Sequence, residues 1–191
     1  MSIVEIHPEH IYGPWIDGFV LDRHVLSSRF IEYLGERPQF DTTRSPLGEL
    51  IYQLKYRNCK PDSIVETAVT FITGKWINVF DCVVPPPPSL HRTKQPAVLI
   101  AEGIAAHFGV PVLPAATIKE MATEQMKNVS VDERAPMLLK AIQAGSESVK
   151  GRRVLLVDDL WETGSTLRRV AEVLGQMGAS EIRALVMTRT R

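Results

Sequence analysis

The stretch VLLVDDLWETGST, residues 154–166, constrains the fold of this chain more than any other part of its sequence. Its unbroken apolar run is typical of a strand that is covered on both faces, as in a parallel sheet packed between helices. Asp158 and Asp159 follow that run, and a hydroxyl-rich turn around Gly164 leads into a segment whose apolar residues recur at helical spacing. We therefore expect a strand, an acidic pair, a tight turn and a helix in direct succession.

Strands and helices also alternate in the neighbouring parts of the chain. Apolar and β-branched runs over residues 76–84, 110–115 and 181–188 predict three further strands. An alanine-rich helix is expected between the first two of these, ending at Gly109. This alternation predicts an α/β fold with a Rossmann-like, doubly wound parallel sheet, and we assign it to a core domain over residues 76–191.

Residues 1–75 are expected to form an N-terminal cap, or hood, that contains helices. Ser45 is placed to cap a helix and Pro46 stands at its first position, with an apolar stripe following. A second helix is predicted over residues 62–74. Residues 1–40 are compatible with either a hairpin or an irregular cap.

Composition excludes several classes of partner. The chain is 45% hydrophobic and 23% charged with a formal net charge of zero, which is ordinary for a soluble globular protein. We therefore expect no general attraction to nucleic acid or to an anionic membrane surface. No apolar stretch reaches the length of a membrane span, and the amino terminus lacks the pattern of a secretory signal.

The two cysteines, Cys59 and Cys82, are isolated in the sequence, and the five histidines are scattered. Buried free thiols are the expected state of both cysteines, which is consistent with a reducing cytoplasm. The absence of zinc-type spacing gives a transition-metal site little support.

The proline-rich run VVPPPPSLHRTKQP, residues 83–96, has two interpretations. Four consecutive prolines usually indicate an exposed polyproline linker. Here they join a predicted strand to a predicted helix, so we favour a stiff loop at the edge of the sheet.

The chemistry of residues 158–166 depends on where ligands bind in a parallel sheet, which is the crevice outside the carboxyl ends of the strands. Successive backbone N–H groups at a helix N-terminus suit a phosphate. Carboxylates there accept hydrogen bonds from vicinal hydroxyls and can support Mg²⁺. A sugar phosphate fits both parts of the stretch, because its hydroxyls can bind the acidic pair and its phosphate can bind the turn. The alternative is that Asp158 and Asp159 only cap the turn that Gly164 shapes.

The same stretch resembles the phosphoribosyl-pyrophosphate (PRPP) binding motif of the type I phosphoribosyltransferases. The resemblance implies that Asp158 and Asp159 contact the ribose 2′ and 3′ hydroxyls, and their expected support of Mg²⁺ is indirect or weak. It implies that the 5′-phosphate is held by Thr163, Gly164, Ser165 and Thr166. The family fold, a five-stranded parallel core, and a homodimer are also implied.

A weaker resemblance to the ComF-type, amidophosphoribosyltransferase-related branch rests on LGELIYQLKYRN, VVPPPPS and single residues of the following long segment. That branch often carries an N-terminal Cys-x-x-Cys zinc element and an Arg-Gly-Phe-Asn-Gln stretch after its proline loop. This chain has neither, and RTKQP stands where the second might be. These departures leave the subfamily open.

PRPP carries a diphosphate, so cations should gather near the acidic pair. The loop after the first core strand provides Ser89, Arg92 and Lys94, and the end of the first predicted helix provides Lys55 and Arg57. The alternatives are a solvated basic turn for the loop and ordinary helix-terminal cations for the helix.

The connection over residues 117–150 is long for a compact domain, and long connections are often lids. We expect a hood here that closes over the sugar, with a short helix over residues 135–142. Its polar residues are individually as compatible with the surface as with ligand contact; those considered are Gln125, Lys127, Asn128 and Arg134.

Glu162 and Trp161 interrupt the motif. By the resemblance, an acid just before the Thr-Gly pair exchanges a proton with a purine ring in purine phosphoribosyltransferases, so Glu162 is a candidate general acid or base. A helix-start glutamate is also favourable without any catalytic role. Trp161 is compatible with stacking on a planar base and with packing inside the protein.

The predicted function is Mg²⁺-dependent transfer of 5-phosphoribose from PRPP to a nitrogen acceptor, a nucleobase or ammonia, with release of pyrophosphate. Glu162, Asp158 and Asp159 are the expected catalytic residues. A non-catalytic PRPP or nucleotide sensor, including a competence-related one, is the alternative from another class. An unrelated doubly wound sugar-phosphate protein is a third.

Overall fold

The computed structural model describes residues 2–76, 79–88, 95–120 and 141–190. Its long strands are β2 (Asp17–Arg23), β3 (Val25–Leu34), β4 (Arg37–Arg44), β8 (Arg153–Trp161) and β9 (Glu181–Arg189). Its short ones are β1 (Glu9–His10), β5 (Cys82–Val84), β6 (Thr117–Lys119) and β7 (Ile142–Ala144). The described helices are α1 (Pro46–Tyr56), α2 (Asp62–Lys75), α3 (Pro96–Phe108) and α5 (Ser165–Gln176).

A central sheet has the strand order β1-β2-β9-β8-β5. Strands β2, β9, β8 and β5 run parallel to one another, while the short β1 is antiparallel to β2. A single parallel bridge between Val83 and Val112 brings the predicted strand 110–115 alongside β5. The predicted α/β fold with a parallel sheet is confirmed. Of the predicted strand 76–84, only Cys82–Val84 pairs with its neighbours among the described residues.

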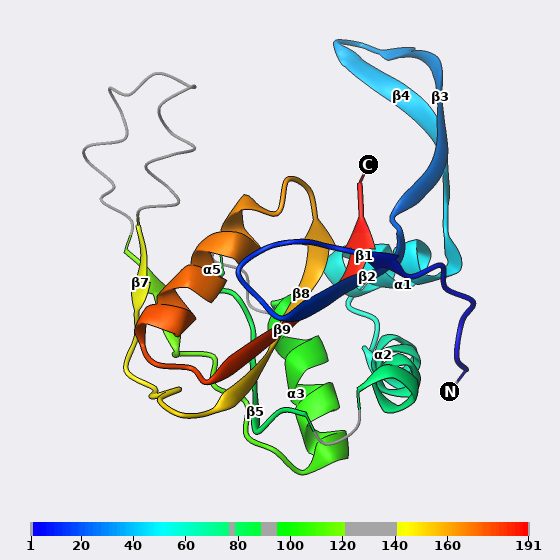
Figure 1. Cartoon of the computed structure of the whole chain (residues 1–191). Helices are drawn as coiled ribbons and strands as arrows, with labels where there is room; N and C mark the ends of the chain where they lie inside the picture. The colour runs from blue at the N-terminus through cyan, green and yellow to red at the C-terminus, as the bar shows by residue number, and fades with distance from the viewer. Residues whose placement is uncertain (1, 77–78, 89–94, 121–140, 191) are drawn as a thin grey trace, which may run out of the picture.

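Strand β8 lies inside this sheet, between β9 and β5, and is covered on both faces, as its apolar run predicts. Leu155 and Val157 pack into a core with α1, α2 and α3, whereas Val154 and Leu156 pack into a second core with α5. Figure 1 shows α5 on one side of the sheet and α2 and α3 on the other. Because side chains alternate along a strand, the residues that follow Val157 also face opposite sides.

The N-terminal part of the chain contributes directly to the sheet. Strand β2 pairs in parallel with β9, from Asp17 opposite Arg183 to Arg23 opposite Arg189. Its Phe19 and Leu21 are buried in the same core as α1 and α2. The division into a cap of residues 1–75 and a core of residues 76–191, and the hood, stay predictions. Two strands of the central sheet, β1 and β2, come from the N-terminal side of that boundary.

A two-stranded hairpin, β3 and β4, follows β2 and extends away from the rest of the molecule (Figure 1). It ends at a two-residue turn in which Gly35 has a positive φ of 64°. The hairpin alternative for the N-terminal region is therefore present, although it runs on to Arg44.

Local signals at helix ends agree with the structure. Ser45 caps α1, with its hydroxyl oxygen accepting from the Gly48 N–H at 3.0 Å, and Pro46 opens the helix. Gly109 ends α3 in the left-handed conformation, with φ of 66°. Cys82 is buried as expected, but Cys59 is exposed because it follows the end of α1 in an irregular segment on the surface.

The proline loop after β5 is buried over most of its described part. Pro85, Pro86 and Pro87 are buried and Pro88 is exposed, so the loop is packed against the domain and is not an exposed linker there. Within the described ranges, no helix is both long and apolar enough to cross a membrane.

Candidate functional site

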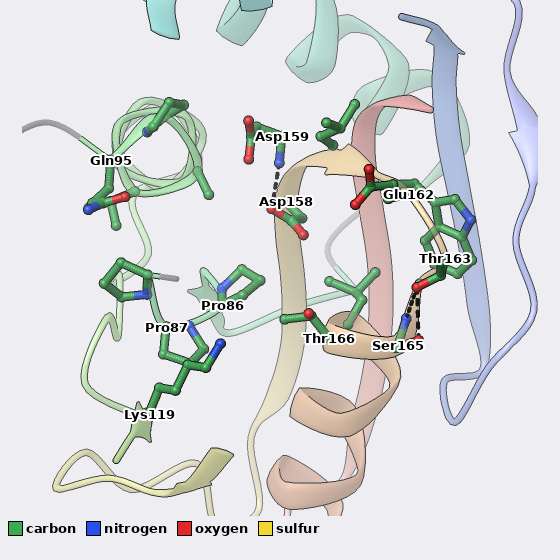
Figure 2. A pocket seen from close by; sticks show the side chains of 18 of the residues that line it. Pro86, Pro87, Gln95, Lys119, Asp158, Asp159, Glu162, Thr163, Ser165 and Thr166 are labelled. Atoms are coloured by element: carbon green, nitrogen blue, oxygen red, sulfur yellow. Dashed lines mark hydrogen bonds between the residues drawn. The ribbon is translucent and has the colours of Figure 1, made fainter. Parts of the chain in front are cut away.

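A cavity of about 280 Å³ lies at the carboxyl ends of β5 and β8 (Figure 2). Three groups of residues line it: the end of β8 with the turn into α5, the proline loop with the start of α3, and single lysines from α1 and β6. The lining consists of Lys55, Pro86–Pro88, Gln95–Val98, Lys119 and Asp158–Leu167. The structure thus brings the acidic pair, the hydroxyl-rich turn, Glu162 and Lys55 into one cavity.

Asp158 and Asp159 are the last acidic positions of β8 and face opposite sides of the sheet. Asp158 continues the side on which α5 packs, and Asp159 continues the side of α1. The Asp159 N–H donates to Asp158 Oδ1 at 2.8 Å. Burial, and next the negative charge of Asp159, raise the pKa of Asp158 well above the ordinary carboxyl range. Asp158 therefore holds a proton more strongly than an exposed aspartate.

Lys55 forms an ion pair with Asp159 across the site. The lysine stands in the last turn of α1, and its ammonium contacts Asp159 Oδ2. The two side chains are only 15% and 14% exposed, so water screens this pair weakly. Lys55 was predicted as a diphosphate ligand, and in this structure it also neutralises one of the two acids. Arg57 does not line the described cavity; its guanidinium lies over the Tyr52 ring, 5.9 Å from its centroid.

A second layer of polar groups holds the backbone of Asp159. The Thr188 hydroxyl donates to the Asp159 carbonyl at 3.2 Å, and His24 Nδ1 lies 3.1 Å from the same hydroxyl. Burial and the nearby charges of Lys55 and Arg44 lower the pKa of His24. Sequence reasoning missed Thr188 and His24, because their role depends on β9 lying beside β8 and on β2 lying beside β9.

The turn Thr163–Thr166 leads from β8 into α5. Gly164 adopts a left-handed conformation, with φ of 74°, and the helix begins at Ser165. The hydroxyls of Thr163 and Ser165 lie 2.8 Å apart (Figure 2). The first turn of α5 carries no acidic residue, and its N–H groups have no carbonyl partners within the helix. This turn therefore has the geometry and charge that suit a phosphate.

Trp161 packs beneath this turn. A side chain at position 164 would collide with its ring, so Gly164 is required both by its backbone conformation and by the closeness of Trp161. The ring meets Trp15 edge to face, with centroids 6.2 Å apart, and the Arg168 guanidinium lies 5.1 Å from its centroid. Of the two interpretations of Trp161, these contacts favour packing.

Arg168, on α5, ties the turn to the N-terminal segment. It donates to the Thr163 carbonyl at 3.0 Å, and to the Tyr12 carbonyl through Nε and a terminal nitrogen at 3.3 and 3.2 Å. Sequence reasoning did not single out this arginine. It keeps a positive charge close to the proposed phosphate cradle.

Glu162 is exposed at the rim of the cavity, next to the turn (Figure 2). Lys119 and Gln95 lie across the cavity from it, beside the prolines. Burial lowers the pKa of Lys119. Lys119 was missed in the sequence because it stands at the start of the long connection, where no motif marks it. Its position at the base of the β6–β7 pair places it in the cavity wall.

Several predicted contacts lie outside the described residues. These are Ser89, Arg92 and Lys94 of the proline loop and Gln125, Lys127, Asn128 and Arg134 of the long connection, together with most of the predicted helix 135–142. The described strands β6 and β7 pair antiparallel at the two ends of that connection.

The described residues contain no group of three or more histidine, cysteine, aspartate or glutamate side chains able to hold a metal ion. Asp158 and Asp159 are the two carboxylates available at the carboxyl end of β8. A pair of carboxylates fits Mg²⁺ that arrives with a phosphate-bearing ligand, because Mg²⁺ keeps few protein ligands and shares its coordination with substrate oxygens.

Residues 94–191, about half of the chain, match the model of the phosphoribosyl transferase domain. The chain belongs to this family. The matched residues include β8, its acidic pair, the turn and α5, so the phosphoribosyl transferase domain carries most of the cavity. The finer resemblance to the ComF-type branch stays a prediction.

Solved structures of similar fold include several phosphoribosyltransferases. The B. subtilis glutamine PRPP amidotransferase is 22% identical, with a TM-score of 0.48, over 77% of this chain and 33% of that one. Orotate phosphoribosyltransferase from Aeropyrum pernix is 17% identical, with a TM-score of 0.48, over 87% and 76%. Purine phosphoribosyltransferase from Pyrococcus horikoshii is 18% identical, with a TM-score of 0.44, over 68% and 82%.

The present chain spans about a third of the length of the amidotransferase chain that it matches. Among curated proteins, no sequence matches the chain.

Proposed function

We propose that this protein binds PRPP and transfers its 5-phosphoribosyl group to a nitrogen acceptor, a nucleobase or ammonia, with release of pyrophosphate. The observation that carries the proposal is the single cavity in which the acidic pair of β8 stands beside the phosphate-type turn of α5. Membership of the phosphoribosyl transferase domain family supports it.

In this proposal the ribose hydroxyls bind to Asp158 and Asp159. In the free protein Asp159 is paired with Lys55, and burial raises the pKa of Asp158, so that carboxyl keeps its proton to higher pH than an exposed aspartate. Two hydroxyl groups can replace these partners because each donates a hydrogen bond to a carboxylate. Binding the sugar therefore releases the Lys55 ammonium inside the cavity.

The 5′-phosphate is assigned to the turn Thr163, Gly164, Ser165 and Thr166. Backbone N–H groups at the start of α5, the nearby hydroxyls and the helix dipole all favour an anion at this point. Arg168 adds a positive charge behind the turn.

The diphosphate is assigned to the opposite wall. Lys119 and the released Lys55 are the described cations there, and Ser89, Arg92 and Lys94 of the proline loop are proposed to complete the set. Buried prolines stiffen the described part of that loop, which lowers the entropic cost of holding the ligand.

Mg²⁺ is proposed to enter with PRPP, supported by Asp158 and Asp159. When bound, it would neutralise charge on the departing diphosphate. The protein's own contribution is to hold the sugar and its phosphate in place and to present cations toward the leaving group.

Glu162 is the proposed general acid or base toward the acceptor. As the bond between C1′ and the diphosphate breaks, positive charge develops on the ribose ring, as in other glycosyl transfers. The attacking nitrogen must lose a proton, and Glu162 stands at the rim of the cavity with its side chain exposed to an incoming acceptor.

A test of turnover uses the full chain with PRPP, Mg²⁺ and a panel of purines, pyrimidines and ammonia, with pyrophosphate release as the readout. Release above background with one acceptor supports the transferase. Firm PRPP binding without release for any acceptor supports a PRPP sensor instead. Binding of other sugar phosphates but not PRPP supports an unrelated sugar-phosphate protein.

Two further predictions concern the oligomeric state and the location of the protein, and the proposed chemistry depends on neither. Pairing of two copies is implied by the family resemblance, and a cytoplasmic location is implied by the unpaired cysteines.

A further inference from the structure

The β3–β4 hairpin has one aromatic face and one charged face. In its register Phe30 lies opposite Phe40, and Tyr33 lies opposite Pro38. The rings of Phe30 and Phe40 are 5.9 Å apart, and those of Phe30 and Tyr33 are 5.2 Å apart, so all three aromatic side chains gather on one face. Ser28 and Thr42 share this face, with their hydroxyls 3.3 Å apart.

The other face alternates with the first, as the pleat of a strand requires. It carries Arg29 opposite Asp41, Glu32 opposite Gln39, and Leu34 opposite Arg37. A sheet with one apolar and one charged face is the pattern of a sheet packed on one side and solvated on the other.

Among the described parts of the chain, none packs on the aromatic face. Phe30 is 47%, Tyr33 67% and Phe40 53% exposed, although the three rings already touch one another. The hairpin extends away from the rest of the molecule (Figure 1), so neither the helices nor the central sheet cover it. A two-stranded hairpin standing alone in water is marginally stable at best, and three or more strands or a packed face normally support it.

We propose that the aromatic face of the β3–β4 hairpin packs against the same face of a second copy of this chain. Two hairpins then form a small four-stranded sandwich, in which each supplies the apolar surface that the other lacks. The arrangement has a two-fold axis and is closed, because the same patch is used on both copies.

The distribution of charge on the two faces of the hairpin favours a second copy of the chain as the partner of the aromatic face. Six paired positions on the aromatic face are uncharged: Ser28, Phe30, Tyr33, Pro38, Phe40 and Thr42. The charged exception is Arg44, opposite Val25 at the base of the hairpin, where it stacks on Tyr52 and pairs with Glu49. Two such faces meet without like-charge repulsion. The opposite face carries both signs, with Arg29 and Arg37 beside Glu32 and Asp41, and the whole chain has a net charge of zero. The aromatic face carries no cluster of basic side chains, which nucleic acid or an anionic lipid surface would need for binding.

The exposed area of the aromatic face is large enough for a small dimer interface. Aromatic side chains carry about 150–250 Å² each. At the exposed fractions above, and with the flanking small residues, one face presents on the order of 500 Å². Two copies bury roughly 1,000 Å², which is the lower limit for a biological interface and the size of a weak, reversible one.

The proposal is independent of the transferase chemistry, because the hairpin lies outside the cavity lining. Its test is sedimentation velocity of the full chain over a concentration series, with wild type, Phe30→Ser/Phe40→Ser and the matched control Leu34→Ser. Leu34 is 70% exposed and sits on the charged face of the same hairpin. We expect a concentration-dependent dimer whose dissociation constant rises roughly 100-fold or more in the double variant and stays near wild type in the control.

A second measurement does not depend on removing apolar residues. In a Cys59→Ser background, spin labels at Ser28→Cys and Ser27→Cys, adjacent exposed serines on opposite faces, report distances between copies by pulsed electron resonance. We expect the labels at position 28 to lie closer together than those at position 27.

Four results of these two measurements overturn the proposal. They are a wild-type chain that stays monomeric throughout the series, a double variant that associates like wild type, a Leu34→Ser control that dissociates equally, and label distances in the reverse order. A monomer that co-sediments with phosphatidylcholine vesicles through Phe30 and Phe40 would assign the face to lipid and also overturn it.

Discussion

Lys55 and Asp159 form an ion pair that joins the last turn of α1 to the carboxyl end of β8. The pair is largely shielded from water and stands where the ribose is proposed to bind. It therefore couples the stability of the free protein to the occupancy of its site.

Lys55→Met should destabilise the free protein. The substitution leaves the Asp159 carboxylate shielded from water without its cation, and we expect the free energy of unfolding to fall by about 2 kcal/mol. Urea denaturation measures this, with the exposed Lys60→Met as control. Adding Asp159→Asn should restore part of the loss in a double-mutant cycle. Equal stability of Lys55→Met and wild type would show that the pair contributes nothing.

Asp158→Asn should change how stability depends on pH. Because the folded protein raises the pKa of Asp158, the folded state binds this proton more strongly than the unfolded state. The stability from this group is fully present below the ordinary carboxyl pKa and is lost as pH rises through the raised value. The asparagine variant, which does not titrate, should therefore gain stability relative to wild type as pH rises from about 4 through neutrality.

Thermal unfolding across that range measures the difference, and Asp41→Asn, in the exposed hairpin, serves as the control. A difference that stays constant or falls with pH would contradict the raised pKa. The stabilised variant should at the same time bind PRPP more weakly, since asparagine offers one acceptor oxygen where the carboxylate offers two.

Gly164→Ala should disturb the turn, and Gly175→Ala in the same helix should not. At position 164 the alanine meets both a positive φ and the Trp161 ring, so we expect a loss of about 1–3 kcal/mol together with weaker PRPP binding. At position 175 the added methyl meets open space, and the helix should gain about 0.5–1 kcal/mol. Two variants of equal stability would refute the assigned role of Gly164.

Glu162→Gln should separate catalysis from binding. Its side chain is exposed, so stability and the dissociation constant for PRPP should remain near wild type, whereas kcat should fall by about 10²–10⁴ if it moves the acceptor proton. Steady-state kinetics with the best acceptor of the panel measures this, with Glu36→Gln in the hairpin turn as control. An unchanged kcat would remove Glu162 from the mechanism.

How much of this the sequence predicts depends on the range of the contacts involved. The unit from β8 to α5 is contiguous, so its strand, acids, turn and helix are all visible in one stretch of sequence, residues 153–176. The caps at Ser45 and Gly109 are local for the same reason.

Contacts between distant segments could not be predicted in this way. Strand β2 has an apolar run of only three residues, Phe19, Val20 and Leu21, and it joins the sheet by pairing with β9 at the far end of the chain. The approach of His24 and Lys119 to the site depends on such tertiary packing. Lys55 was predicted to contact the diphosphate because of its charge. Its ion pair with Asp159 could not be predicted, because that pair depends on where α1 packs.

The most direct test of the central claim is calorimetric titration of the full chain with PRPP and Mg²⁺, beside Asp158→Asn/Asp159→Asn. We predict one PRPP per chain, and an affinity at least about 100-fold lower in the double variant, because both ribose hydroxyls lose their carboxylate acceptors. A folded wild-type protein that gives no binding, or a double variant that binds PRPP as tightly as wild type, would contradict this account.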